Sequence, residues 1–273
     1  YIGTGNPEAK ILIIAKEPSF EKTDAQRMYE FENNIEFWER DKEKSLWDVP
    51  YNPAEMISPL CPFKGQLQKL NNGQNNGTSR TWLNYQKLHN YIFDDLDDSY
   101  GRINFHKNFF TTELNSSPSP KNRDADTSSI VGRKSFIANS KFFQNFPVII
   151  LDGVGYFEIS ENKNEIEELF GVTFDRNISE EEKQPVWIHQ NFVTKKLVLN
   201  TYQMSRNVSE NRLRLMGETI QNFLRLIDPL PSQSGMYTRG EERFAKGGKE
   251  ILEKMRIEGF ENSDEYKDYM TWV

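Results

Sequence analysis

Polar and charged side chains that could do chemistry follow several short apolar runs of this sequence. Glu17 stands two residues after the end of the run that closes at residue 15, Glu113 and Asn115 follow a second run, and Gln203 follows the last one. A carboxylate can orient or deprotonate a water molecule, and amides donate and accept hydrogen bonds with a ligand. These residue types therefore predict a polar cleft, provided that the fold brings them together.

The apolar runs have the composition of strands that are buried on both faces. Each is short, rich in β-branched or aromatic residues, and apolar without alternation. Amphipathic patterns predict helices, the clearest of which begins near Ser209, its expected N-cap, and ends before Pro229. Strands that alternate with helices predict an α/β fold, in which ligands bind at the carboxyl ends of parallel strands. The expected strands are residues 10–15, 108–112, 148–151 and 196–201, and the other expected helices are residues 78–93 and 130–146.

Three segments, taken in order along the chain, resemble a known family. Residues 3–14 (GTGNPEAKILII) run into a Lys-Glu-Pro turn at 16–18, residues 109–113 read FFTTE, and residues 197–206 read LVLNTYQMSR. This order and spacing resemble the uracil-DNA glycosylase superfamily over roughly residues 1–228. In that family the first strand leads to an acid or amide that serves the hydrolytic water, and the last strand ends in His-Pro-Ser.

The resemblance implies roles for individual residues. Glu17 would serve the hydrolytic water and stabilise the oxocarbenium-like sugar, while Gln203 would contact the leaving base. A base in duplex DNA would first be flipped out of the stack. Phosphates would contact Ser205, Arg206 and the loop that carries Lys121 and Arg123. The substrate-binding residues implied in this way are Lys16, Pro18, Tyr29, Phe31, Glu113, Asn115, Tyr202, Ser205 and Arg206.

The sequence departs from the family at three positions. Gln203 stands in place of the family's His, and Met204 in place of its Pro. Glu113 stands where the family often has Asn, with Asn115 two residues further on. A Gln amide donates a hydrogen bond but is a poorer partner for a developing anion than imidazole. A carboxylate at residue 113 would repel a uracil carbonyl unless it is protonated.

Each candidate residue also has a purely structural interpretation. Glu17 could cap the next turn or pair with its neighbour Lys16, and Glu113 could be a paired structural acid. The arginines at 206, 212 and 214 read as solvated charges on the last helix. The segment Asp-Gly-Val-Gly at 152–155 reads as a tight turn rather than a phosphate-binding loop. His89, His106 and His189 have no metal-ligand spacing and read as structural.

Composition excludes several classes of protein. The single cysteine, Cys61, rules out disulfide frameworks, cysteine-based zinc sites and iron–sulfur clusters, so we expect no metal and no cofactor. No apolar run approaches the roughly 18 residues of a membrane helix. The net charge is −7, and all of it resides in residues 157–182, which contain nine acids and two bases. That segment reads as a solvated helix and loop that faces away from any nucleic acid.

The sequence as a whole predicts a cytoplasmic protein with a three-layer α/β/α sandwich around a central, mainly parallel four-stranded sheet. Residues 1–230 would form this uracil-DNA glycosylase-like domain, and residues 231–273 a C-terminal helical extension. The first functional hypothesis is a divergent DNA glycosylase-like hydrolase that cleaves the N-glycosidic bond of a flipped base. The alternative is a non-catalytic domain that keeps the cleft and binds nucleic acid or a nucleotide. A third is a protein-interaction role through the aromatic C-terminal residues.

Overall fold

A computed structural model describes most of the first 227 residues. The described residues are 1–20, 23, 25–41, 58–60, 79–93, 103–119, 124–178, 184–205 and 208–227. The expected C-terminal extension, residues 231–273, lies outside them, so the domain boundary stays a prediction. Arg206, Lys121 and Arg123, which were expected to contact phosphates, also lie outside the described residues.

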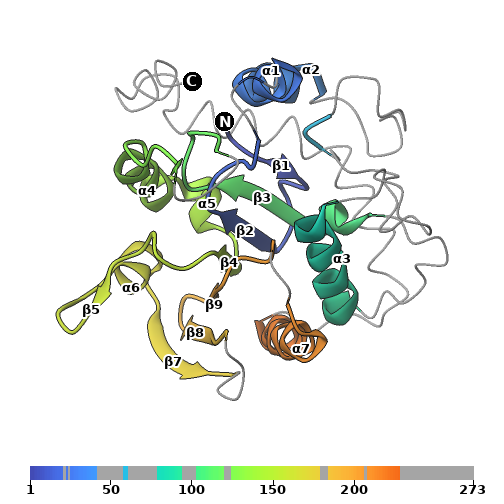
Figure 1. Ribbon diagram of the computed structural model, residues 1–273. Coiled ribbons are helices and arrows are strands. Elements are labelled where there is room, and N and C mark those ends of the chain that lie inside the picture. The colour runs from blue at the N-terminus through green and yellow to red at the C-terminus, as the bar shows by residue number, and fades with distance from the viewer. Residues whose placement is uncertain are drawn as a thin grey trace.

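A seven-stranded mixed sheet forms the centre of the molecule (Figure 1). Its strands are β1 (Thr4–Gly5), β2 (Ile11–Ala15), β3 (Phe109–Glu113), β4 (Val148–Asp152), β7 (Thr173–Asn177), β8 (Val186–Asn191) and β9 (Lys196–Thr201). Their order across the sheet is β1-β3-β2-β4-β9-β8-β7. The four central strands β3, β2, β4 and β9 are parallel, and they match the four strands expected from the sequence. The expected strand number was wrong, because three antiparallel strands extend the sheet at its edges.

Helices cover both faces of the sheet. They are α1 (Ala25–Glu32), α2 (Asn34–Asp41), α3 (Arg80–Phe93), α4 (Ile130–Asn139), α5 (Lys141–Gln144), α6 (Glu165–Phe170) and α7 (Glu210–Ile227), with a 3-10 turn, η1, at Phe105–Lys107. Helices α3 and α7 pack on one apolar face, and α2, α4, α5 and α6 contribute to the core on the other. This arrangement confirms an α/β fold with helical layers on both sides of the sheet.

The expected helices are present with small changes. The stretch 130–146 is two helices, because the backbone of Ser140 is extended between α4 and α5. Ser209 caps α7 as expected, since its hydroxyl accepts a hydrogen bond from the Arg212 amide at 3.1 Å.

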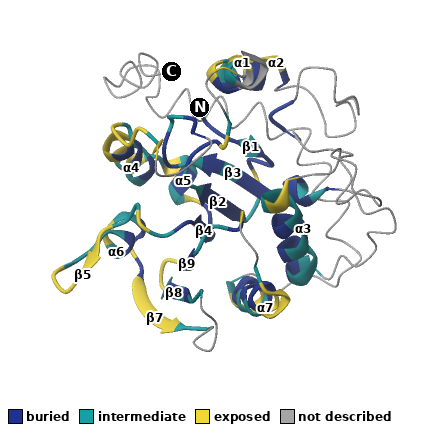
Figure 2. Ribbon diagram, viewed as in Figure 1, coloured by how far each residue is buried: buried dark blue, intermediate teal, exposed yellow. Residues whose placement is uncertain are grey.

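The acidic segment 157–182 has more strand than expected. It contains α6, but also strand β7 and a hairpin of β5 (Ile159–Ser160) and β6 (Lys163–Asn164). Strand β7 was missed because its sequence, TFDRN, is polar and almost wholly exposed at the sheet edge (Figure 2). Edge strands commonly carry charged residues, which removes the apolar signal that identifies buried strands.

One row of residues crosses the carboxyl edge of the parallel strands. Ala15 lies between Glu113 on one neighbouring strand and Asp152 on the other, and Asp152 in turn lies beside Thr201. Residues in register on parallel strands point to the same face, which here is the face covered by α3 and α7. The fold therefore gathers two carboxyl groups and a hydroxyl at the edge where α/β proteins bind ligands.

Candidate active site at the carboxyl edge of the sheet

The loop that carries Glu17 is fixed by backbone hydrogen bonds to the loop after β3. The amide of Asn115 donates to the carbonyl of Lys16 at 2.7 Å, and the amide of Ser119 donates to the carbonyl of Pro18 at 2.9 Å. The pairing of β2 with β3 thus continues past the ends of both strands. Residues 16–18, which the sequence singled out, have a defined backbone at the strand end.

Glu17 is a buried carboxylate with one occupied and one unoccupied oxygen. Glu17 is only 5% exposed. Its Oε2 accepts a hydrogen bond from the hydroxyl of Tyr156, which lies in the loop after β4. Its Oε1 is enclosed and has no hydrogen-bond partner among the described residues. The surface-pairing interpretation of Glu17 therefore does not fit, because the side chain is buried and its recorded partner is a tyrosine.

Tyr156 links Glu17 to Lys16. The Lys16 ammonium lies 4.5 Å from the centroid of the Tyr156 ring. The stem of Lys16 runs across Gly153, where a Cβ atom would lie 2.6 Å from the Lys16 Cγ. Gly153 and Gly155 both have positive φ, which confirms the expected tight turn at 152–155. Glycine at 153 therefore gives Lys16 room to contact Tyr156.

The surroundings of Glu113 favour its protonated form. Burial raises the pKa of Glu113 well above its usual value, and the nearby charges of Asp152 and Glu17 raise it further, against the opposing effect of Arg133. Its Oε2 has no hydrogen-bond partner among the described residues. A protonated carboxyl can donate a hydrogen bond to a carbonyl, which an ionised one cannot. The predicted repulsion between Glu113 and a base carbonyl is thereby relieved.

Asp152 anchors the far side of the row, although the sequence did not single it out. Its two oxygens accept hydrogen bonds from the Tyr85 hydroxyl of α3 and from the Met204 amide, both at 2.6 Å. Burial raises the pKa of Asp152 to about 6, in spite of these bonds and the charges of Arg212 and Lys16. Asp152 therefore fixes the loop after β9 and contributes charge that titrates near neutrality.

Arg212 contradicts the expectation of a solvated helix charge. It is 1% exposed, and its guanidinium donates to the Thr201 hydroxyl, the Tyr202 carbonyl and Gln184. The side chain points inward because it lies on the same face of α7 as the apolar core residues. Arg214, by contrast, is exposed and pairs with Glu218, as expected for a solvated arginine.

Asn115 holds its own loop together. Its Oδ1 accepts hydrogen bonds from the Ser129 hydroxyl at 2.8 Å and the Ser117 amide at 3.0 Å, and its Nδ2 donates to the Asp126 carbonyl at 2.8 Å. The side chain is fully buried. These bonds hold together the loop beside Glu17, and the base contact that the resemblance implies for Asn115 stays a prediction.

The other expected site residues lie around this edge in different environments. Gln203 and Tyr202 are partly buried in the loop after β9, where Tyr202 packs against Trp187 with ring centroids 5.9 Å apart, while Ser205 is exposed. In α1, Phe31 is buried and stacks on Tyr1 at 4.5 Å, and Tyr29 is half exposed. The Tyr1 ring therefore already covers one face of the Phe31 ring.

Metal and membrane sites do not emerge from the part of the chain that the structure describes. No group of three or more His, Cys, Asp or Glu residues there has the arrangement of a metal site. No helix there has both the length and the apolar character needed to cross a bilayer. His89, His106 and His189 are each buried and lie apart from the carboxyl row.

The sequence alone did not identify four contributors to this edge, which are Tyr85, Asp152, Tyr156 and Arg212. Only Asp152 had a usable signal, since it ends an apolar run as Glu113 does.

Comparison with protein-family models, with curated proteins and with solved structures finds no match for this chain.

Proposed function

We propose that the protein hydrolyses the N-glycosidic bond of a nucleobase, with Glu17 serving the attacking water. The observation that carries this proposal is the state of the Glu17 carboxylate. Tyr156 holds one of its oxygens, and the other is enclosed, without a partner among the described residues, at the ligand-binding edge of the sheet. A buried carboxylate oxygen that lacks a partner is suited to accept a hydrogen bond from a water molecule.

The two nearby carboxyl groups divide the chemistry. Water attacks the anomeric carbon and loses a proton to Glu17, the carbon–nitrogen bond breaks, and its electron pair leaves with the base. Protonated Glu113 donates its proton to the departing base, as a general acid does. Solvent then returns the proton from Glu17 to Glu113, so that the net reaction consumes one water. The negative charge of Glu17 also stabilises the cationic sugar of the transition state.

The raised pKa of Glu113 supports this division, because a general acid must still carry its proton at the pH of the reaction. Gln203, in the loop after β9, supplies an amide to the leaving base in place of imidazole. The proposed substrate is a base flipped out of DNA, which the resemblance favours. The second candidate function is binding of a nucleotide without cleavage.

A cleavage assay with the purified full chain tests this proposal. The substrates are single- and double-stranded oligonucleotides that contain uracil, hypoxanthine, xanthine or an alkylated base. We expect abasic sites with the wild type, and a loss of at least about a hundredfold in Glu17→Gln. Glu36→Gln, an exposed residue of α2, is the matched control and keeps full activity. Salt-sensitive binding without cleavage would instead support the non-catalytic candidate.

A further inference from the structure

A pocket lies on the face of the sheet opposite to the carboxyl row. It has a volume of about 490 Å³ and is bounded by the loop after β4, by the β5–β6 hairpin and by strands β7, β8 and β9. Asn200 lines it and faces the same side as Val198 and Leu151, which belong to the core beneath α4 and α6. Thr201, the next residue, points to the α7 face. The pocket and the carboxyl row are therefore separate sites.

Two buried polar residues, Asn200 and His189, line this pocket. Asn200 is 4% exposed, and its Oδ1 has no hydrogen-bond partner among the described residues. A buried polar group that lacks a partner costs about 1–3 kcal/mol. Burial lowers the pKa of His189, against a backbone hydrogen bond with Trp187, which keeps its imidazole neutral at pH 7. A ligand with its own polar edge would satisfy the Asn200 amide.

Aromatic side chains form the walls around these polar atoms. Phe157, Phe174 and Trp187 all line the pocket. Phe174 is 52% exposed, and its ring meets the edge of the His189 ring at a centroid distance of 5.5 Å. Aromatic walls favour flat ring systems, which stack on them. The volume lies within the range of small-molecule pockets, about 300–1,000 Å³.

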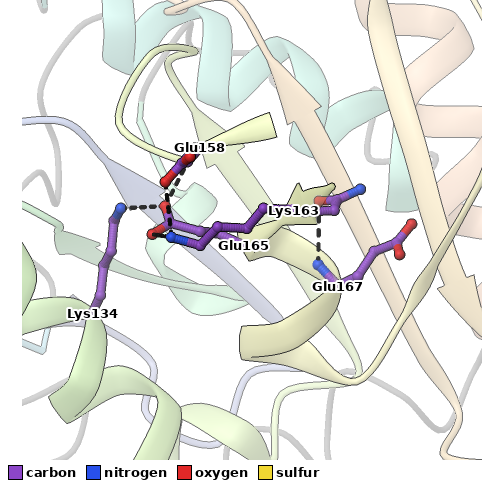
Figure 3. Close-up of polar contacts among 6 residues, drawn as sticks. Lys134, Glu158, Lys163, Glu165 and Glu167 are labelled. Atoms are coloured by element: carbon purple, nitrogen blue, oxygen red, sulfur yellow. Dashed lines mark hydrogen bonds and ion pairs between the residues drawn. The ribbon is translucent and has the colours of Figure 1, made fainter. Parts of the chain in front are cut away.

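A network of ion pairs fixes the outer wall in place (Figure 3). Glu165 accepts hydrogen bonds from Lys134 of α4, from the Glu158 amide at 2.7 Å and from Lys163 at 3.4 Å. Asn164, which lines the pocket, caps α6 by accepting from the Glu167 amide. The hairpin and α6 are thereby held against the rest of the domain, so the pocket exists without a ligand.

The charge around the pocket selects the kind of ligand. The hairpin, α6 and β7 lie within residues 157–178, which contain six acids and two bases and so carry a net charge of −4. The charge of Glu167 acts directly on His189. A phosphorylated ligand would be repelled by this surface, whereas an uncharged one would not.

We propose that this pocket binds an uncharged planar heteroaromatic compound of the nucleobase or nucleoside class. The Asn200 amide presents an acceptor beside a donor, which matches the adjacent donor and acceptor on the edge of a base. The ring stacks against the aromatic walls. Glu17 does not line this pocket, so binding here does not require the Glu17 carboxylate. The pocket shares one element with the first site, since Gly155 and Phe157 line the pocket and flank Tyr156.

Calorimetric titration of the full chain with adenosine and uridine tests the proposal. We expect saturable binding of at least one of them, and weaker binding of its 5′-monophosphate. Asn200→Leu replaces the unpartnered amide by an apolar group of similar volume, and the affinity should fall about tenfold. Its Tm should stay equal or rise, because a buried unsatisfied group is removed. The matched control Asn139→Leu, at an exposed position of α4, should bind as the wild type does.

Three results would overturn the proposal. They are the absence of binding at millimolar nucleoside, an unchanged affinity in Asn200→Leu, or tighter binding of the monophosphate. If Asn200→Leu fails to fold, Phe174→Ala decides, because this half-exposed side chain lines the pocket. Its affinity should fall severalfold, and an unchanged affinity would refute the site. Glu17→Gln should bind normally, so a failure of the hydrolase proposal leaves this test intact.

Discussion

The hydroxyl of Tyr156 donates a hydrogen bond to Oε2 of Glu17, and this bond joins the loops that follow two adjacent parallel strands. Because it occupies one carboxylate oxygen, the other is left to bind water in a defined direction. Lys16 lies against the same tyrosine ring at 4.5 Å and steadies it. The geometry of the proposed base therefore depends on a residue 139 positions away in sequence.

Removing only that hydroxyl tests the relationship. In Tyr156→Phe the ring remains to contact Lys16, but Glu17 loses its partner, so kcat should fall by about tenfold or more with little change in KM. A tyrosine that served folding alone would lower Tm and leave kcat of the folded enzyme intact. Steady-state kinetics together with thermal unfolding separate these outcomes.

The raised pKa of Glu113 predicts a pH dependence. The acid form persists to higher pH than in a solvated glutamate, and activity should fall as the pH rises through that pKa. Glu113→Gln keeps a hydrogen-bond donor but cannot transfer a proton. We expect a lower kcat and a profile without this alkaline fall. A variant that retains the wild-type profile would show that another group donates the proton.

The central sheet could be predicted because burial on both faces leaves a distinctive apolar run. Strand β4, Val148–Asp152, is wholly buried and had this signal, whereas the exposed edge strand β7 had none. Position relative to a strand end likewise identified Glu17 and Glu113. This part of the site follows from topology, since parallel strands place their carboxyl ends at one edge.

The hydrogen-bond partners of the strand-end residues Asp152 and Thr201 could not be predicted, because these partners come from distant elements. Tyr85 reaches Asp152 from α3, and Arg212 reaches Thr201 from α7. Such contacts depend on how the helices pack, and a helical arginine has the same sequence signature whether it points inward or to solvent. The proposed nucleoside pocket depends in part on the edge strand β7, whose polar, exposed sequence had no apolar signal.

Asp152 should make the protein less stable at neutral pH than at mildly acidic pH. Its pKa is about 6 in the folded state and 3.8 when exposed, so the folded state binds more protons between these values. Stability therefore decreases as the pH rises from 3.8 to 6, by about 3 kcal/mol for this group, and stays lower above pH 6.

Asp152→Asn removes that ionisation while the side-chain oxygen still accepts from the Met204 amide. We expect the variant to be more stable than the wild type at pH 7 and similar to it near pH 4. Urea unfolding across this pH range measures the difference. A variant that is destabilised equally at all pH values would show that the hydrogen bond from Tyr85 outweighs the cost of the buried charge.

Asn34 should be a main determinant of stability at the start of the chain. Its Oδ1 accepts from the amides of Ile2 and Gly3 at 2.9 and 3.2 Å, and its Nδ2 donates to the Gly3 carbonyl at 3.1 Å. Asn34→Ala leaves buried backbone groups without partners, which should lower the free energy of unfolding by about 3 kcal/mol. Its neighbour Asn33 makes one exposed contact to the Tyr29 carbonyl. Asn33→Ala is therefore the matched control, with an expected loss below about 0.5 kcal/mol, and equal losses in the two variants would contradict this role of Asn34.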